Sequence, residues 1–165
     1  MTRTAILLRA VNLGSRNQLS MPEVRRRLEA HGYQDVVTYL RSGNVVAAGD
    51  VAAGDIAELL GVDVITRSHA ELREIVDGNP FPQHADEPAK LAVAFCDRAP
   101  IGSIPPDAYA PDEFIVKTKN IFLWYPQGQG RSKMGPGFGK KLGVMTTVRN
   151  WNTVRKLLEL TGPDR

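Results

Sequence analysis

The sequence lacks acidic residues over a long stretch of its second half. Between Glu113 and Glu159 there are 45 consecutive residues without Asp or Glu, and nine of them are Lys or Arg. Uncompensated positive charge attracts anions. The stretch includes a glycine-rich segment, 126–141, and backbone N–H groups without a neighbouring Cβ can approach a phosphate closely. These features indicate a class of ligand and leave the reaction, if there is one, open.

Cysteine is also scarce, because Cys96 is the only one among 165 residues. A single cysteine excludes an intramolecular disulfide framework, and its place in the apolar run 91–96 indicates a buried, inert thiol. No apolar run approaches the ~18 residues of a membrane span. The four-residue apolar run before Arg9 is too short for a signal peptide. We therefore expect a cytoplasmic protein with no membrane partner.

Residue patterns for metal binding and catalysis are missing as well. His31, His69 and His84 are scattered without metal-ligand spacing, and one cysteine cannot complete a zinc set. There is no G-x-S-x-G motif and no pair of carboxylates spaced for acid–base work. The glycine-rich segment matches neither the Walker nor the dinucleotide-binding pattern. We expect neither metal nor cofactor, and the residues leave open whether the protein is an enzyme.

The charge that is present is unevenly distributed along the chain. Residues 1–80 contain nine basic and ten acidic side chains, whereas residues 81–165 contain twelve basic and eight acidic ones. A proline-rich stretch at 78–84 lies between them and indicates a boundary. We therefore expect two halves, 1–80 and 81–165, with the excess of positive charge in the second.

Hydrophobic periodicity predicts the order β-α-β-β-α-β in the first half, followed by one more helix. Ser20 and Ser68 each precede a Glu by three residues, a capping box that marks a helix start. The order is that of a ferredoxin-like fold. The expected strands are 4–9, 36–41, 44–48 and 62–66, and the expected helices begin near 20, 52 and 68.

The second half follows the same order. A weak, proline-interrupted helix or turn is expected at 101–109, and Asn150 is expected to cap a final helix with Trp151 in its core. The fold class is therefore α+β, with two tandem ferredoxin-like halves, antiparallel sheets and an extra helix after each half. The expected strands are 91–96, 114–118, 121–125 and 144–148, with a short helix near 138–142.

Four motifs follow one another along nearly the whole chain. They are residues 8–14 (L-R-A-V-N-L-G), 39–45 (Y-L-R-S-G-N-V), 125–133 (Y-P-Q-G-Q-G-R-S-K) and 149–154 (R-N-W-N-T-V). Together they resemble the family called domain of unknown function 1697. The resemblance implies a small bacterial-type cytosolic protein with tandem ferredoxin-like halves, and it brings no established activity, cofactor or catalytic residue.

The chain departs from the family's pattern at three places. Ala10 and Ser15 stand where glycine is usual, and the glycines of 135–139 stand where relatives usually have helix formers. Interior glycine costs a helix about 1 kcal/mol relative to alanine. We therefore expect the helix at this position to be short or displaced.

The glycine-rich loop is the first candidate site. It follows an expected strand and precedes an expected helix, where a helix N-terminus, the Ser132 hydroxyl and two cations could hold a phosphate. Arg149 would be free to face the same ligand. The competing interpretation is a surface turn whose charges are merely solvated. The predicted anion-binding residues are Gly128, Gly130, Arg131, Ser132, Lys133 and Arg149.

A secondary cluster of polar residues follows the first expected strand, and it has no obvious packing role. The residues at the expected hairpin near Asn44 fit a structural turn better than a site, because asparagine tolerates positive φ. The secondary cluster consists of Arg9, Asn12, Arg16 and Asn17.

The function indicated is the binding of a phosphate-bearing ligand, a nucleotide or nucleic acid, by the basic glycine-rich loop. One alternative is an acylphosphatase-like phosphate hydrolase that uses the loop after the first strand, although the characteristic motif of those enzymes is absent. Another alternative is a homodimeric interaction module that pairs exposed sheet edges without catalysis.

Overall fold

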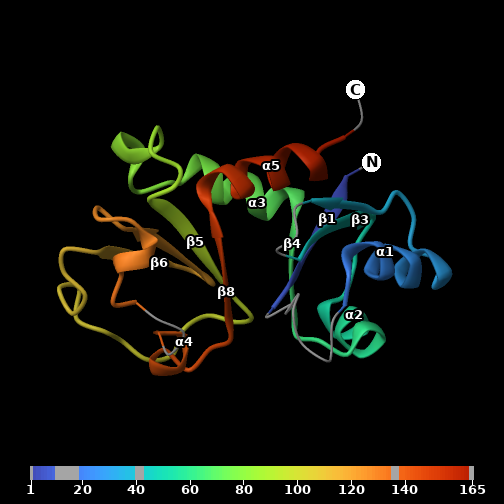
Figure 1. The fold of residues 1–165 in the computed structure, drawn as a ribbon, viewed down its shortest axis with the longest axis horizontal. Helices are drawn as coiled ribbons and strands as arrows, with labels where there is room; N and C mark the ends of the chain where they lie inside the picture. Colours follow the sequence, from blue (N-terminus) through green and yellow to red (C-terminus); the bar gives the residue numbers. More distant parts are fainter. Residues whose placement is uncertain (1, 10–18, 40–42, 135–137, 164–165) are drawn as a thin grey trace. The chain divides into compact units, whose positions relative to one another are not determined.

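The computed structural model describes residues 2–9, 19–39, 43–134 and 138–163 (Figure 1). Within these residues the fold is α+β, with two four-stranded antiparallel sheets and five α-helices. The chain divides into two compact units, and each contains one of the sheets. The first unit comprises residues 1–74 and 157–165, and the second comprises residues 75–156.

The sheet of the first unit has the strand order β2-β3-β1-β4. Its strands and the helices that accompany them in the chain are β1 (Arg3–Leu8), α1 (Met21–Ala30), β2 (Val37–Tyr39), β3 (Asn44–Ala48), α2 (Ala53–Leu60), β4 (Val64–Ser68) and α3 (His69–Asp77).

The sheet of the second unit has the corresponding order β6-β7-β5-β8. Short 3-10 turns lie at Pro82–His84 and Gln129–Arg131. The strands and helices are β5 (Leu91–Cys96), β6 (Glu113–Lys117), β7 (Asn120–Trp124), α4 (Phe138–Lys141), β8 (Thr146–Asn150) and α5 (Trp151–Thr161).

The helix starts are confirmed where a capping residue predicted them. Ser20 Oγ accepts a hydrogen bond from the N–H of Glu23 (3.3 Å). At α3 the capping box is complete, because Ser68 Oγ accepts from the N–H of Glu71 (3.1 Å) and the Glu71 carboxylate accepts from the N–H of Ser68 (2.9 Å). Asn150 caps α5 through a bond from the N–H of Thr153 (2.9 Å). Each cap satisfies N–H groups that the helix itself leaves without a partner.

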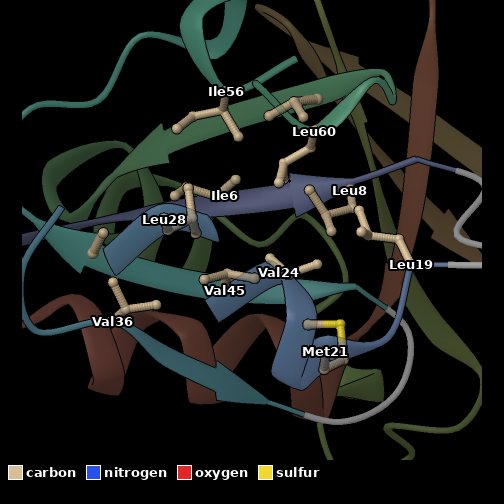
Figure 2. Packing of buried hydrophobic residues seen from close by; sticks show 12 residues of the cluster. Ile6, Leu8, Leu19, Met21, Val24, Leu28, Val36, Val45, Ile56 and Leu60 are labelled. Carbon is tan, nitrogen blue, oxygen red and sulfur yellow. The ribbon is translucent and has the colours of Figure 1, made fainter. Parts of the chain in front are cut away.

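The core of the first unit lies between one face of its sheet and the helices α1 and α2 (Figure 2). Alternate residues of β1, Ile6 and Leu8, point into it, as the two-residue period of a strand requires. Helix α1 contributes Val24 and Leu28, which lie one turn apart on the same helix face. Burying an aliphatic side chain of this size contributes about 1.5–3 kcal/mol, so this packing holds the helices on the sheet.

The core of the second unit covers one face of the sheet β6-β7-β5-β8. Tyr109, Phe114 and Phe138 meet edge to face, with ring centroids 5.3–6.3 Å apart, a favoured geometry for aromatic pairs. Cys96 is buried in this core, as the apolar run around it predicted. The core therefore depends on aromatic side chains from a loop, an edge strand and the four-residue helix α4.

The two sheets repeat one another residue by residue. Arg67 lies opposite Ala5 in one sheet, and Arg149 lies opposite Val93 at the same register position of the other. Both arginines are buried, and each donates from Nη1 to the carbonyl of its preceding residue, at 2.9 and 3.0 Å. The equivalence is a repeat that a comparison of the two halves by sequence alone does not reveal.

A second pair of buried polar residues shows the same repeat. Asn44 begins β3 opposite Leu7, and Asn120 begins β7 opposite Phe95. The expectation that Asn44 sits at the hairpin with positive φ is wrong. The positive φ, 83°, belongs to Gly43, while Asn44 uses its side-chain amide to donate to the carbonyl of Tyr39 at 3.1 Å.

Several boundaries in the second half differ from the expected ones. The last strand, expected at 144–148, is β8 at Thr146–Asn150. The preceding turn takes up Val144, which donates to Gly139 O at 3.0 Å and is buried in the core. The hairpin turn expected at 119–120 lies one residue earlier, with Thr118 at φ 54°. Residues 97–112 form turns and no helix, because the Pro105-Pro106 pair cannot continue one.

Candidate functional site

The glycine-rich loop leaves the end of β7 in a defined conformation. Tyr125 N–H donates to Lys90 O at 2.8 Å, and Gly128 N–H donates to Tyr125 O at 2.9 Å, which closes a tight turn. Gly128 has φ 88° and ψ 154°, a region that is essentially reserved for glycine. The glycine therefore determines the direction in which the loop departs from the sheet.

The backbone of this loop is open to approach from outside. A Cβ placed on Gly128 or on Gly130 would meet no other heavy atom within 4 Å. Open space beside a backbone without a Cβ is what close contact with a phosphate oxygen requires. The N–H groups of Gly128, Arg131 and Ser132 already donate to carbonyls of the loop, so an anion would depend on the other main-chain N–H groups, such as that of Gly130, and on the side chains.

The two cationic side chains of the loop are exposed and have no acidic partner among the described residues. The side chains of Arg131 and Lys133 are exposed, and neither forms an ion pair or side-chain hydrogen bond with any residue that the structure describes. Ser132 Oγ accepts a hydrogen bond from the N–H of Met134 at 2.9 Å. This bond orients the hydroxyl and leaves its proton available for donation.

The helix expected directly after the loop does not follow it directly. A three-residue 3-10 turn, Gln129–Arg131, lies within the loop. The described part of α4 is Phe138–Lys141, and residues 135–137 lie outside the described residues. Within the described residues, no helix N-terminus lies directly after the loop to hold an anion. The chemistry of the loop therefore comes from its own backbone and side chains.

Arg149 does not lie with the exposed side chains of the loop. It is 7 % exposed on β8, and its Nη1 donates to Thr147 Oγ1 at 2.6 Å and to Val148 O at 3.0 Å. Burial lowers the pKa of its guanidinium to about 10, so it stays charged at neutral pH. The expectation that Arg149 faces outward is not met, because β8 extends two residues further than expected and brings Arg149 into the sheet.

The base of the loop contains two residues that the sequence analysis did not single out. Asp112 and Tyr125 flank the ends of β6 and β7, next to the register pair Glu113 and Trp124. Both are buried. Burial raises the pKa of the Tyr125 hydroxyl, and the nearby Asp112 carboxylate acts in the same direction. Asp112 thus supplies negative charge beside the loop. A count of acidic residues that starts after Glu113 misses it, although the pairing of the two hairpin strands places Asp112 next to Tyr125.

The secondary cluster is described only in part. Arg9 follows β1, where its backbone N–H donates to Asp63 O at 2.9 Å and its Nη1 lies 3.6 Å from Asp63 Oδ2. This carboxylate offsets the charge that Arg9 would offer to an anion. Asn12, Arg16 and Asn17 lie outside the described residues.

In the part of the chain that the structure describes, no group of three or more His, Cys, Asp or Glu side chains is placed to hold a metal ion. Within those same residues, none of the helices has the length and apolar character needed to cross a membrane.

Comparison with known proteins places the chain in a family. No curated protein matches the sequence. The structure is similar to that of the conserved bacterial protein SP0830 from Streptococcus pneumoniae, with a TM-score of 0.66 and 18% identity, over 98% of this chain and 99% of that one. At this identity the similarity concerns the fold alone. Residues 1–122, more than half of the chain, match the family described as protein of unknown function (DUF1697), and the chain therefore belongs to this family.

Proposed function

We propose that the protein binds a phosphate-bearing ligand, a nucleotide or a nucleic acid, on its glycine-rich loop. The observation that carries the proposal is the pair of exposed cations, Arg131 and Lys133, on a backbone that is open at Gly128 and Gly130. Exposed cations that already have acidic partners gain little from an anion, whereas uncommitted ones can form charge-assisted hydrogen bonds to it.

The roles of the loop residues follow from their chemistry. Arg131 presents a planar fork that suits two phosphate oxygens, and Lys133 acts as a point charge. The Ser132 hydroxyl, oriented by the N–H of Met134, donates its proton to a third oxygen. In this proposal Arg149 does not contact the ligand, because it is buried and its guanidinium is hydrogen-bonded within its own strand.

Binding is tested by titrating the protein with inorganic phosphate, ATP, a single-stranded RNA and a single-stranded DNA at low and at moderate salt. For the nucleic acids, affinity should fall steeply with salt, because cations that contact phosphates release condensed counterions. Arg131→Ala and Lys133→Ala should each weaken binding and reduce the magnitude of the salt slope for the single strands by roughly 0.7 per lost phosphate contact.

The matched control is Arg73→Ala, which removes another exposed arginine, on helix α3. It changes the net charge as Arg131→Ala does, and it should leave affinity and salt slope nearly unchanged. Absence of binding by all four ligands at low salt would refute the proposal. So would an equal loss of affinity in the Arg73→Ala control, because it would show that only net charge matters.

The hydrolase alternative draws no support from Arg9, whose guanidinium is paired with Asp63. It rests on fold-level analogy, which is a weak guide to chemistry. Turnover of acetyl phosphate that is lost in Arg9→Ala would favour it, and the absence of turnover at high protein concentration would eliminate it.

We also propose that each half is ferredoxin-like, with the division near residue 80. In both sheets the first strand of the half lies between its third and fourth strands, and all pairs are antiparallel, an arrangement expected from two β-α-β units that interleave. A reducing cytoplasm is the proposed compartment, and the single, buried Cys96 supports it.

A further inference from the structure

Strand β6 (Glu113–Lys117) lies at the edge of its sheet with an exposed surface. The strand order places β7 on one side of β6, and no strand of the described residues pairs with its other side. Ile115 and Val116 are 38% and 42% exposed, and they are two of the few large apolar residues that are exposed in the described part of the chain. An exposed edge with apolar side chains is a template for pairing with another strand.

The direction of the free backbone groups follows from two hydrogen bonds of the neighbouring strands. Cys96 N–H donates to Lys119 O at 2.9 Å, and Tyr125 N–H donates to Lys90 O at 2.8 Å. In β7 and the residues next to it, 119–125, the backbone N–H and C=O groups of odd-numbered residues therefore point toward β5. Because these directions alternate along a strand, the backbone groups of the even-numbered residues point toward β6. There they pair with the odd-numbered residues of β6. The N–H and C=O groups of Phe114 and Val116 are thus left pointing out of the sheet.

The side chains on this strand are self-complementary. Glu113, Ile115 and Lys117 alternate with the other two residues and so share one face of the sheet. If a second copy of β6 lies antiparallel across a two-fold axis at Ile115, Glu113 of each copy faces Lys117 of the other. In the same register Phe114 and Val116 exchange their free backbone hydrogen bonds across the axis.

We propose that two copies of this chain associate through antiparallel pairing of their β6 strands, centred on Ile115. The pairing joins two four-stranded sheets into one continuous eight-stranded sheet. It covers part of the exposed surface of Ile115 and Val116. It also places two pairs of opposite charge directly across from one another on the two strands, where each pair stabilises the dimer. The proposal does not depend on ligand binding by the glycine-rich loop.

Lys117 has contacts within its own sheet that the pairing must compete with. Its Nζ donates to Gly78 O at 2.6 Å and lies 5.7 Å from the centre of the Phe122 ring on β7. These contacts draw the ammonium group toward β7, so the side chain turns toward the free edge to meet the partner's Glu113. An ammonium group has three donors, and the side chain is exposed, so this change of rotamer is open to it.

The pairing strand is short, so the interface belongs to the small class. We therefore expect an equilibrium between monomer and dimer that depends on protein concentration. Sedimentation velocity of the full chain over a concentration series should show a dimer fraction that rises with concentration. A monomer at every concentration up to the solubility limit would overturn the proposal.

Charge reversal tests the register. Glu113→Lys and Lys117→Glu each place like charges opposite one another in both pairs, and each should raise the dissociation constant of the dimer by about tenfold or more. A mixture of the two single variants forms heterodimers in which every pair is again of opposite charge, so dimerisation should return on mixing. The double variant should dimerise by itself.

The control for bulk charge is Glu58→Lys, on the exposed face of helix α2. It should dimerise as the parent does. Dimerisation unaffected by the single reversals, or restored equally when Lys117→Glu is mixed with Glu58→Lys, would overturn the β6 register.

Backbone tests do not depend on the charged residues. Val116→Pro removes an outward-pointing N–H without breaking the ladder to β7, so it should prevent dimerisation while circular dichroism stays unchanged. Hydrogen exchange at the Phe114 and Val116 amides should slow as concentration rises, while the Ile115 amide, already bonded to β7, stays protected throughout. Fast exchange at Phe114 and Val116 in a dimer would show that a surface other than β6 forms the dimer, and it would overturn the proposal.

Discussion

At the scale of single residues, burial separates two arginines that the sequence groups together. Arg131 and Arg149 both belong to the basic stretch without acidic residues. Arg131 is exposed on the loop, whereas Arg149 is buried in β8 with hydrogen bonds to its own strand. A count of charges cannot make this distinction, because it depends on where the strand ends. The structure therefore assigns Arg149 to the sheet and Arg131 to the exposed surface of the loop.

Gly128 and Gly130 offer a direct test of how the loop is held. Gly128 has φ 88° and ψ 154°, whereas Gly130 has no positive φ, and both have space for a Cβ. Gly128→Ala should therefore lower the free energy of unfolding by about 1–3 kcal/mol, the cost of that backbone region for other residues. Gly130→Ala should change it by less than about 0.5 kcal/mol.

Urea denaturation of both variants measures the difference. The two substitutions add the same methyl group to the same loop, so Gly130→Ala controls for size. Equal effects would show that the conformation of Gly128 is not what holds the loop.

Glu23 gives a pH dependence with a defined sign. Its carboxylate accepts hydrogen bonds from Arg26 (2.6 and 2.9 Å) and from Arg27 (3.0 Å), and these lower its pKa from 4.5 to about 2. Because the folded pKa lies below the unfolded value, the stabilisation is present above pH 4.5 and is lost as pH falls toward 2. Glu23→Gln should remove this part of the acid sensitivity.

The measurement is an NMR titration of the Glu23 carboxyl carbon at low salt, since exposed pairs are screened by salt. In Arg26→Gln the pKa should move back toward 4.5, because Arg26 is the largest cause of the shift. A pKa near 4.5 in the unmodified protein would contradict the expectation.

At the scale of elements, local signals located the helix starts but not the last strand. Capping residues act on N–H groups within three residues of them, so Ser68 and Asn150 could be read from the sequence. The start of β8 depends instead on how the turn after α4 folds, where Val144 packs into the core. Apolar character alone cannot tell a buried turn residue from a strand residue.

The capping box of α3 should be measurable. Ser68→Ala removes the acceptor for the N–H of Glu71 and should lower the free energy of unfolding by about 0.5–2 kcal/mol. Ser68→Gly should cost only a few tenths of a kcal/mol at the same position, because glycine is itself tolerated as an N-cap. Thermal or urea unfolding of both variants tests this, and a greater loss with glycine than with alanine would speak against a capping role.

At the scale of the whole molecule, the order of elements and its repetition in the second half were predictable, but the residue-by-residue equivalence of the two halves was not. Strand and helix order follows from periodicity, which each half carries in its own residues. The equivalence of Arg67 with Arg149, and of Asn44 with Asn120, appears only in the register of the sheets. The apolar residues around them differ between the halves, so local sequence similarity is too weak to align them. The family match, over residues 1–122, also ends before the glycine-rich loop.

Residues 157–165, at the end of the sequence, help to stabilise the first unit. Residues 157–165 belong to the same compact unit as residues 1–74. Arg3 Nη1 donates to two carbonyls at the end of α5, Leu160 O at 3.4 Å and Gly162 O at 3.3 Å. The hydroxyl Oγ1 of Thr161 lies 3.1 Å from His69 Nδ1. A cation at a helix C-terminus is favourable because it meets the negative end of the helix dipole.

A chain that ends at residue 156 should therefore be less stable by at least ~2 kcal/mol, since it loses the fully buried Leu157 and these hydrogen bonds. A chain that ends at Gly162 keeps all of them, and its new carboxylate lies where Arg3 already points. It should unfold at the same urea concentration as the full chain. If both truncations unfold like the full chain, the last turns of α5 do not stabilise the first unit, and the division of the chain near residue 80 would describe the folding units better.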